Sequence, residues 1–167
     1  MLKAQDVVVA LKLVDASPDE KAFPKLALAL GISASEVHGA VKRAIACGLV
    51  DGETRCVRKE ALSEFLVHGL RYVFPARWSG VTRGLPTSYA APPLKSQLAE
   101  GELPPVWPHP EGTARGEGLA PLYKSAPGAA LRDPHLYEWL ALVDAVRGGR
   151  ARERKLAGQE IERRLRA

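Results

Sequence analysis

Apolar residues recur at helical spacing through much of the first 71 residues. Val7, Val8, Leu11 and Val14 share one stripe and predict a helix over residues 2–15. A second helix is predicted from Pro24 to Gly31. Proline suits a first helical position because its nitrogen has no hydrogen to leave unpaired, and glycine suits a helix end because it accepts a positive φ.

A third helix is predicted over residues 34–46, within the stretch GISASEVHGAVKRAIACGLVD. Ser33 and Glu36 form a capping box, in which each side chain satisfies a free backbone N–H of the first turn. One face of this helix is apolar and the other is small, polar and basic. The apolar face comprises Val37, Val41, Ala44 and Ile45.

Two short strands and a fourth helix are predicted next. The strands lie at residues 49–50 and 56–57 and are joined by a tight turn, DGETR, at residues 51–55. The fourth helix covers residues 59–71, since apolar residues recur there at helical spacing.

Residues 72–134 differ in composition, because eleven of the 13 prolines lie there. Proline removes a backbone donor and restricts its neighbour, so we expect no long regular element except around residues 94–98. Large aromatic residues are spread through the same segment. Because such side chains tend to be buried, we expect an irregular segment that packs against the protein itself or against a partner.

The chain is predicted to end in two helices. Asp133 and Pro134 suit an N-cap and a first helical position for a helix to about residue 146. Gly148 and Gly149 then precede a charged helix over residues 150–167 with a thin apolar stripe. Three roles stay open for this last helix: dimerisation, contact with phosphates, or a solvated surface helix.

Composition restricts the class of protein. With 46% hydrophobic and 26% charged residues, the 167-residue chain has ordinary globular values, and no apolar run approaches the roughly 20 residues of a membrane span. The start also lacks a signal-peptide pattern, so we expect a cytoplasmic protein with no membrane contact and with Cys47 and Cys56 reduced. The scattered histidines and cysteines predict no metal site, and no cofactor motif is present.

Net charge is unevenly placed along the chain. Residues 1–146 contain 16 basic and 16 acidic residues, so the whole excess of +5 lies in residues 147–167. Across residues 42–59 there are five basic and two acidic residues. One copy of this region is therefore expected to bind nucleic acid weakly, because phosphate neutralisation supplies much of the affinity.

The stretch FPKLALALGISASEVHGAVKRAIACGLVD resembles the winged helix-turn-helix of bacterial transcription regulators of the MarR-like or GntR-like kind. The resemblance covers residues 1–71 and implies a DNA-binding domain there. It leads us to expect a mainly α chain, in which the winged helix-turn-helix is followed by an irregular Pro-rich interaction segment at 72–132 and a C-terminal helical segment at 133–167. The last segment would serve dimerisation or partner binding.

The third predicted helix would then be the recognition helix, because an α-helix fits the major groove and basic side chains pair with guanine edges. Gly39 would allow close approach to the duplex. The turn would place Arg55 against the minor groove or a phosphate, with two further cations nearby on the backbone. The predicted DNA-binding residues are Ser35, His38, Gly39, Lys42, Arg43, Arg55, Arg58 and Lys59.

These patterns favour a sequence-specific double-stranded DNA-binding transcriptional regulator, a repressor acting as a homodimer. Two alternatives stay open: the DNA-binding antitoxin of a toxin–antitoxin pair, with residues 72–167 binding the toxin, and a winged-helix scaffold for protein interaction. No phosphate-binding glycine loop, nucleophile elbow or HExxH helix is present, so we expect no enzyme.

Overall fold

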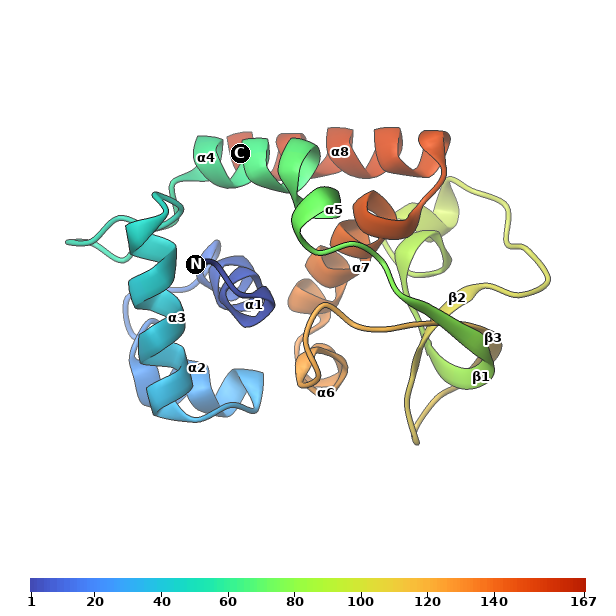
Figure 1. Ribbon diagram of the computed structural model, residues 1–167, viewed down its shortest axis with the longest axis horizontal. Coiled ribbons are helices and arrows are strands. Elements are labelled where there is room, and N and C mark those ends of the chain that lie inside the picture. Colours follow the sequence, from blue (N-terminus) through green and yellow to red (C-terminus); the bar gives the residue numbers. More distant parts are fainter.

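The computed structural model describes all 167 residues (Figure 1). Its first three helices, α1 (Ala4–Leu13), α2 (Phe23–Leu30) and α3 (Ala34–Ala46), pack against one another. Gly31 adopts a φ of 67° in the turn between α2 and α3, and the predicted capping box of Ser33 and Glu36 is present. The predictions for these helices are confirmed, with α1 shorter at both ends than expected.

Helix α1 lies at the centre of the molecule, between α3 and α7 (Pro134–Gly148). Its run from Val7 to Leu11 is buried on every side. A helix that is apolar all round is typical of an element enclosed by others. The N-terminal helices therefore share one hydrophobic core with the C-terminal part of the chain.

The predicted helix over residues 59–71 is divided into three pieces. It comprises α4 (Lys59–Glu64), a π-helical turn (Phe65–Gly69) and α5 (Leu70–Val73). The predicted hairpin before it is reduced to a single bridge between Val50 and Val57. The loop between these two residues protrudes beside α3 (Figure 1).

Residues 72–134 fold into a small closed sheet, two short 3-10 helices (Ser88–Ala90 and Leu94–Ser96) and one α-helix. β1 (Trp78–Pro86) pairs antiparallel with both β2 (Pro105–Pro108) and β3 (Ala114–Leu119), while β2 and β3 pair in parallel. α6 (Ala126–Arg132) follows. Trp107 and Leu94 of this segment lie fully buried in the protein's own core.

Glycine makes this three-stranded closure possible. A Cβ at Gly84 would overlap the carbonyl oxygen of Trp107, and one at Gly116 would overlap that of Pro104. The fully buried Val106 side chain lies against both glycines, so a larger residue at either position would meet it as well.

The prediction of a mainly α chain, with a winged helix-turn-helix followed by an irregular Pro-rich segment and C-terminal helices, is wrong. The fold is mixed α and β, because residues 78–119 form the three-stranded sheet. Prolines are compatible with it because Pro86, Pro105 and Pro108 stand at strand ends, where a missing ladder donor is tolerated.

A buried carboxylate joins the sheet to α7. Asp144 accepts hydrogen bonds from the Thr87 hydroxyl at 2.7 Å and from Trp107 Nε1 at 2.6 Å, and it pairs with Arg147 at 2.8 Å. Arg147 also donates to the carbonyl oxygen of Phe74 at 2.9 Å. Each polar group is matched, as burial requires.

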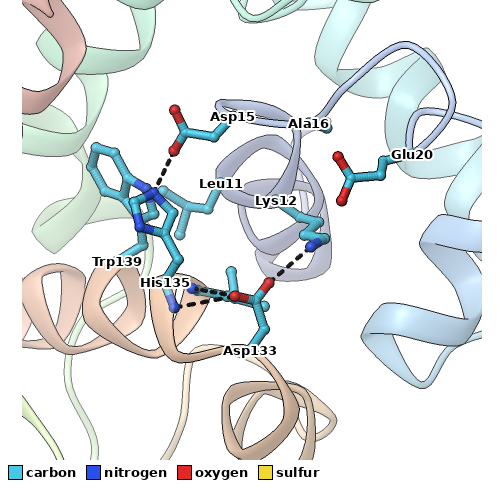
Figure 2. A pocket seen from close by; sticks show the side chains of 9 residues that line it. Leu11, Lys12, Asp15, Ala16, Glu20, Asp133, His135 and Trp139 are labelled. Carbon is cyan, nitrogen blue, oxygen red and sulfur yellow. Dashed lines mark hydrogen bonds and ion pairs between the residues drawn. The ribbon is translucent and has the colours of Figure 1, made fainter.

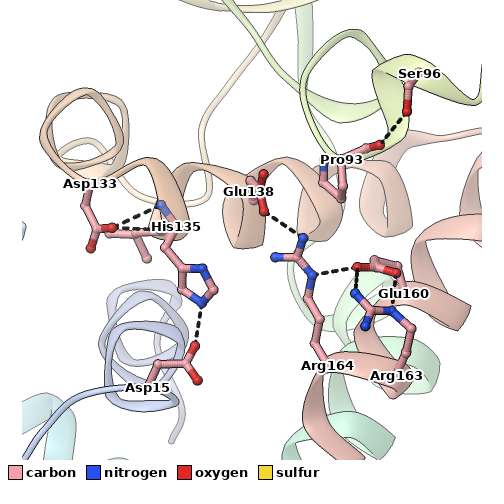
Figure 3. Close-up of polar contacts among 10 residues, drawn as sticks. Asp15, Pro93, Ser96, Asp133, His135, Glu138, Glu160, Arg163 and Arg164 are labelled. Atoms are coloured by element: carbon pink, nitrogen blue, oxygen red, sulfur yellow. Dashed lines mark hydrogen bonds and ion pairs between the residues drawn. The ribbon is translucent and has the colours of Figure 1, made fainter. Parts of the chain in front are cut away.

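Helix α8 (Ala151–Arg166) packs along α7 and α4 (Figure 1). Its apolar residues Ile161 and Leu165 are buried. Arg164 donates to Glu138 of α7 at 2.6 Å and to Glu160 at 2.8 Å (Figure 3). The apolar stripe of the charged helix is thus covered by its own chain and is not free to meet a second copy.

Candidate nucleic-acid interface

The outer face of α3 is a continuous exposed stripe. Ser35, His38 and Lys42 follow one another at three- and four-residue spacing and are all exposed, with half-buried Gly39 beside them. The opposite face, formed by Val37, Ala40, Val41 and Ala44, is buried against the rest of the molecule. α3 forms one end of the molecule, and no other helix covers its outer side (Figure 1).

Arg43 does not belong to this stripe. Its Nε and Nη2 donate to the two carboxylate oxygens of Asp6, at 2.9 and 2.8 Å, and Asp6 is completely buried in α1. These hydrogen bonds raise the pKa of Arg43. The guanidinium that the sequence assigned to DNA is therefore the partner of a buried carboxylate.

Gly39, predicted to allow close approach to DNA, also lies against the Arg43 side chain. A Cβ at this position would lie 3.1 Å from Arg43 Nη1, which is tighter than ordinary contact. Its absence leaves room for Arg43 to reach back toward Asp6. The missing side chain thus makes room for the ion pair, and it also leaves no side chain at this position on the outer face of α3.

The loop over residues 51–56 is built on Asp51. Its Oδ1 accepts hydrogen bonds from the backbone N–H groups of Thr54 and Glu53, at 2.9 and 3.1 Å. The hydrogen bond from the Thr54 backbone is the largest cause that lowers the pKa of Asp51. Arg55 follows with a φ of 55°, a conformation that turns its side chain back toward α2.

Aromatic stacking connects this loop to α3. The Arg55 guanidinium lies 4.5 Å from the centre of the Phe23 ring, and Phe23 meets His38 edge-to-face at 5.4 Å. Arg55, Phe23 and His38 therefore form one surface cluster contributed by the loop, α2 and α3. The structure brings together two of the predicted residues, Arg55 and His38, through a residue that the sequence did not single out.

Two predicted cations contact other groups of the chain. Arg58 lies 3.5 Å from the Asp51 carboxylate, and Lys59 donates to the carbonyl oxygen of Ala167 at 3.0 Å, at the end of α8. Of the eight predicted residues, the outer surface of α3 and its loop holds five, namely Ser35, His38, Gly39, Lys42 and Arg55.

Lys21 is a cation that sequence reasoning missed. Its Nζ lies 3.1 Å from Cys56 Sγ, and this hydrogen bond is the largest cause that lowers the pKa of the Cys56 thiol. The two residues are 35 positions apart in sequence. Only the folded chain brings Lys21 to Cys56, the residue after Arg55, so no local pattern could have revealed it.

A second polar site lies between α1 and the start of α7 (Figure 2). It surrounds a cavity of about 180 Å³, with Lys12 bound to Asp133 at 2.8 Å and His135 bound to Asp15 at 2.5 Å (Figures 2 and 3). These contacts join the two helices, so they hold α7 against α1. The indole Nε1 of Trp139, which also lines the cavity, has no partner.

Nowhere in the chain do three or more His, Cys, Asp or Glu side chains form a group that could hold a metal ion. None of the helices combines the length and the apolar content that crossing a membrane requires. Comparison of the chain with protein-family models, with curated proteins and with solved structures gives no match.

Proposed function

We propose that the protein is a sequence-specific double-stranded DNA-binding transcriptional regulator, which binds through the outer face of α3 and acts as a dimer. The observation that carries this proposal is the uncovered stripe of Ser35, His38 and Lys42 on a capped helix that follows a short glycine turn. A helix preceded by another helix and a turn of three or four residues is the arrangement by which many proteins enter the major groove.

The chemistry of the stripe suits base edges. Lys42 can donate to the acceptors of guanine, and the Ser35 hydroxyl can donate to or accept from several bases. His38 is held in place by its contact with Phe23, so less side-chain entropy is lost on binding. The Arg55 cluster lies beside these residues, where the backbone of a bound duplex would pass.

Electrostatics supports a dimer. Lys42, Arg55 and Lys21 are the basic side chains at this surface, because Arg43 is committed to Asp6. Few phosphates are neutralised by one copy, so one copy binds weakly and with a shallow salt dependence. Two copies on a symmetric site would double both the contacts and the salt dependence.

The proposal is tested by selecting bound duplexes from a random DNA library and measuring their affinity by fluorescence anisotropy. Lys42→Ala should weaken binding about tenfold or more, because a base or phosphate contact contributes about 1–3 kcal/mol. Lys155→Ala is the matched control. This exposed lysine lies in α8 and should leave the affinity unchanged.

Enrichment of no sequence would contradict the proposal. So would an affinity that Lys42→Ala leaves intact, or one that falls equally with Lys155→Ala, since DNA would then meet the general positive charge of the protein.

A further inference from the structure

The outer face of the small sheet exposes large apolar side chains. Trp78 is 45% exposed and Val81 is 46% exposed, and Leu103, in the segment before β2, is 43% exposed. The inner side of the sheet is already filled by Val106 against Gly84 and Gly116. Trp78, Val81 and Leu103 therefore remain as apolar side chains turned to solvent.

An irregularity in β1 keeps these side chains together. Val81 pairs with Glu117 and Trp78 with Leu119, so three residues of β1 advance against two of β3. Such a bulge re-aims the side chains that follow it. It places Trp78 on the same face as Val81 and Arg83 instead of on the glycine face.

One end of this face carries two arginines that lack acidic partners. Arg83 and Arg115 are paired directly across β1 and β3, and neither takes part in an ion pair within the chain. Like charges directly opposite one another destabilise a sheet. The nearest carboxylate on this face is Glu117, two residues along β3 from Arg115, and it forms no ion pair with either arginine.

The other end carries carboxylates. Trp78 and Leu103 line a cleft of about 410 Å³ that also contains Glu100 and Glu153, with Arg150 as its one cation, and Glu117, directly opposite Val81, lines the same cleft on the side of the arginines. None of these three glutamates has an ion-pair partner. Tyr89 also lines the cleft, where burial raises its pKa and the charge of Glu153 raises it further.

We propose that this face, with the apolar centre of Trp78, Val81 and Leu103, binds the same face of a second copy of the chain about a two-fold axis. The arginine end of one copy would then meet the carboxylate end of the other, and the reverse contact would occur as well. Contacts of this reciprocal kind define an isologous interface. The inference names the surface of the dimer in the proposed function, but it does not depend on DNA binding.

Both the charges and the position of the face favour a second copy as its occupant. A partner must offer apolar side chains together with a negative side and a positive side, and the face itself has carboxylates beside Trp78 and Val81 and arginines beyond them. The sheet and α3 lie at opposite ends of the molecule (Figure 1). Dimerisation through the sheet thus leaves both α3 helices uncovered.

Sedimentation velocity over a wide range of protein concentration tests this interface without DNA. The wild-type chain should pass from monomer to dimer as its concentration rises. Arg83→Glu combined with Arg115→Glu should remain monomeric, as should Glu100→Arg combined with Glu117→Arg, because each variant opposes like charges at both ends. An equimolar mixture of the two variants should dimerise, because every contact then joins opposite charges.

Arg152→Glu combined with Arg166→Glu, on exposed positions of α8, is the control and should dimerise as the wild type does. Circular dichroism establishes that each variant is folded. A wild-type chain that stays monomeric throughout, a dimer that survives either charge reversal, or a mixture that stays monomeric would each overturn the proposal. Monomeric wild-type protein that still binds a selected duplex through Lys42 would refute this interface alone and leave the DNA-binding function standing.

Discussion

Lys42 and Arg43 are two adjacent basic residues that the sequence assigned to one binding surface and that the structure separates. Positions 42 and 43 are adjacent and both basic, yet successive residues of an α-helix point about 100° apart. Lys42 consequently faces solvent, while Arg43 turns inward to a carboxylate in α1. The two side chains should behave differently in every measurement that separates binding from folding.

Arg43→Ala should lower the free energy of unfolding by about 3 kcal/mol, because it leaves the buried Asp6 carboxylate without its partner. Chemical denaturation measures this change. Lys42→Ala should leave the unfolding free energy within about 0.5 kcal/mol of wild type, as surface substitutions usually do.

A control isolates the ion pair. Asp6→Leu combined with Arg43→Met replaces both partners by apolar groups of similar size and should recover much of the lost stability. If Arg43→Ala proved neutral to unfolding but abolished DNA binding, our assignment of Arg43 to the fold would be wrong.

Trp107→Phe tests the link between the sheet and α7. Phenylalanine keeps an aromatic ring in the core but removes the N–H that donates to Asp144. Since hydrogen bonds to charged groups contribute about 1.5–3 kcal/mol, we expect a loss of that size in urea denaturation. Trp78→Phe, at an exposed ring on the same sheet, is the control. Equal effects of both changes would speak against a special role for the Asp144 contact.

At the scale of elements, the ion pairs of Glu160 in α8 depend on pH. Hydrogen bonds from Arg163, and then from Arg164, lower the pKa of Glu160 from 4.5 to about 2. A carboxyl with a lowered pKa stabilises the folded state above its unfolded pKa and loses that contribution as the pH falls. The stabilisation by Glu160 should thus be complete above pH 4.5 and decline between pH 4.5 and about 2.

Thermal unfolding across this pH range measures the effect. Glu160→Gln should be less stable than wild type at neutral pH and should lose less of its stability on acidification. Glu162→Gln is the matched variant, because its ion pair with Arg166 is longer, at 3.6 Å, and Arg166 is exposed. If the melting temperatures of wild type and Glu160→Gln fell in parallel, the lowered pKa of Glu160 would make no contribution to stability.

Glycine at the inner face of the sheet gives a second test at this scale. Gly116→Ala should destabilise the fold by about 1–3 kcal/mol or more, because the added Cβ overlaps the carbonyl oxygen of Pro104. Gly80→Ala, in the bulge of β1, introduces a Cβ with no atom within 4 Å and should be tolerated. Chemical denaturation compares the two variants. Equal unfolding free energies would show that closure of the sheet does not require glycine at position 116.

The sequence predicted the helices better than the sheet for a physical reason. α3 and α7 can be recognised from apolar residues at helical spacing and from capping residues next to them in the sequence. The sheet depends instead on glycines that meet strands distant in sequence, and its strands end at prolines that resemble interruptions. A short stretch of sequence shows neither which distant strand a glycine meets nor that a proline marks the end of a strand.

At the scale of the whole molecule, one core joins the N-terminal helices to the C-terminal ones through α1. The candidate interface then lies at one end and the apolar sheet face at the other (Figure 1). Helical periodicity was enough to place Ser35, His38 and Lys42 on one surface. It could not show that Arg43 is taken by Asp6 or that Lys21 joins the loop, because both contacts are made by the tertiary fold.

In the proposed function, DNA contact and self-association use separate surfaces. Charge reversal at Arg83 and Arg115 should therefore weaken binding to a two-half-site duplex while leaving the weak affinity for a single half-site unchanged. Anisotropy with the two duplexes measures both, and an equal loss on both would show that these arginines touch DNA directly.

The most direct test of the central claim is amide chemical-shift mapping by NMR during titration with a duplex selected from a random library. We predict that the perturbed amides lie in α3, the turn that precedes it and the loop over residues 51–56, with those of α8 unchanged. Perturbation centred on α8 or on the sheet, or no perturbation by any selected duplex, would contradict the account.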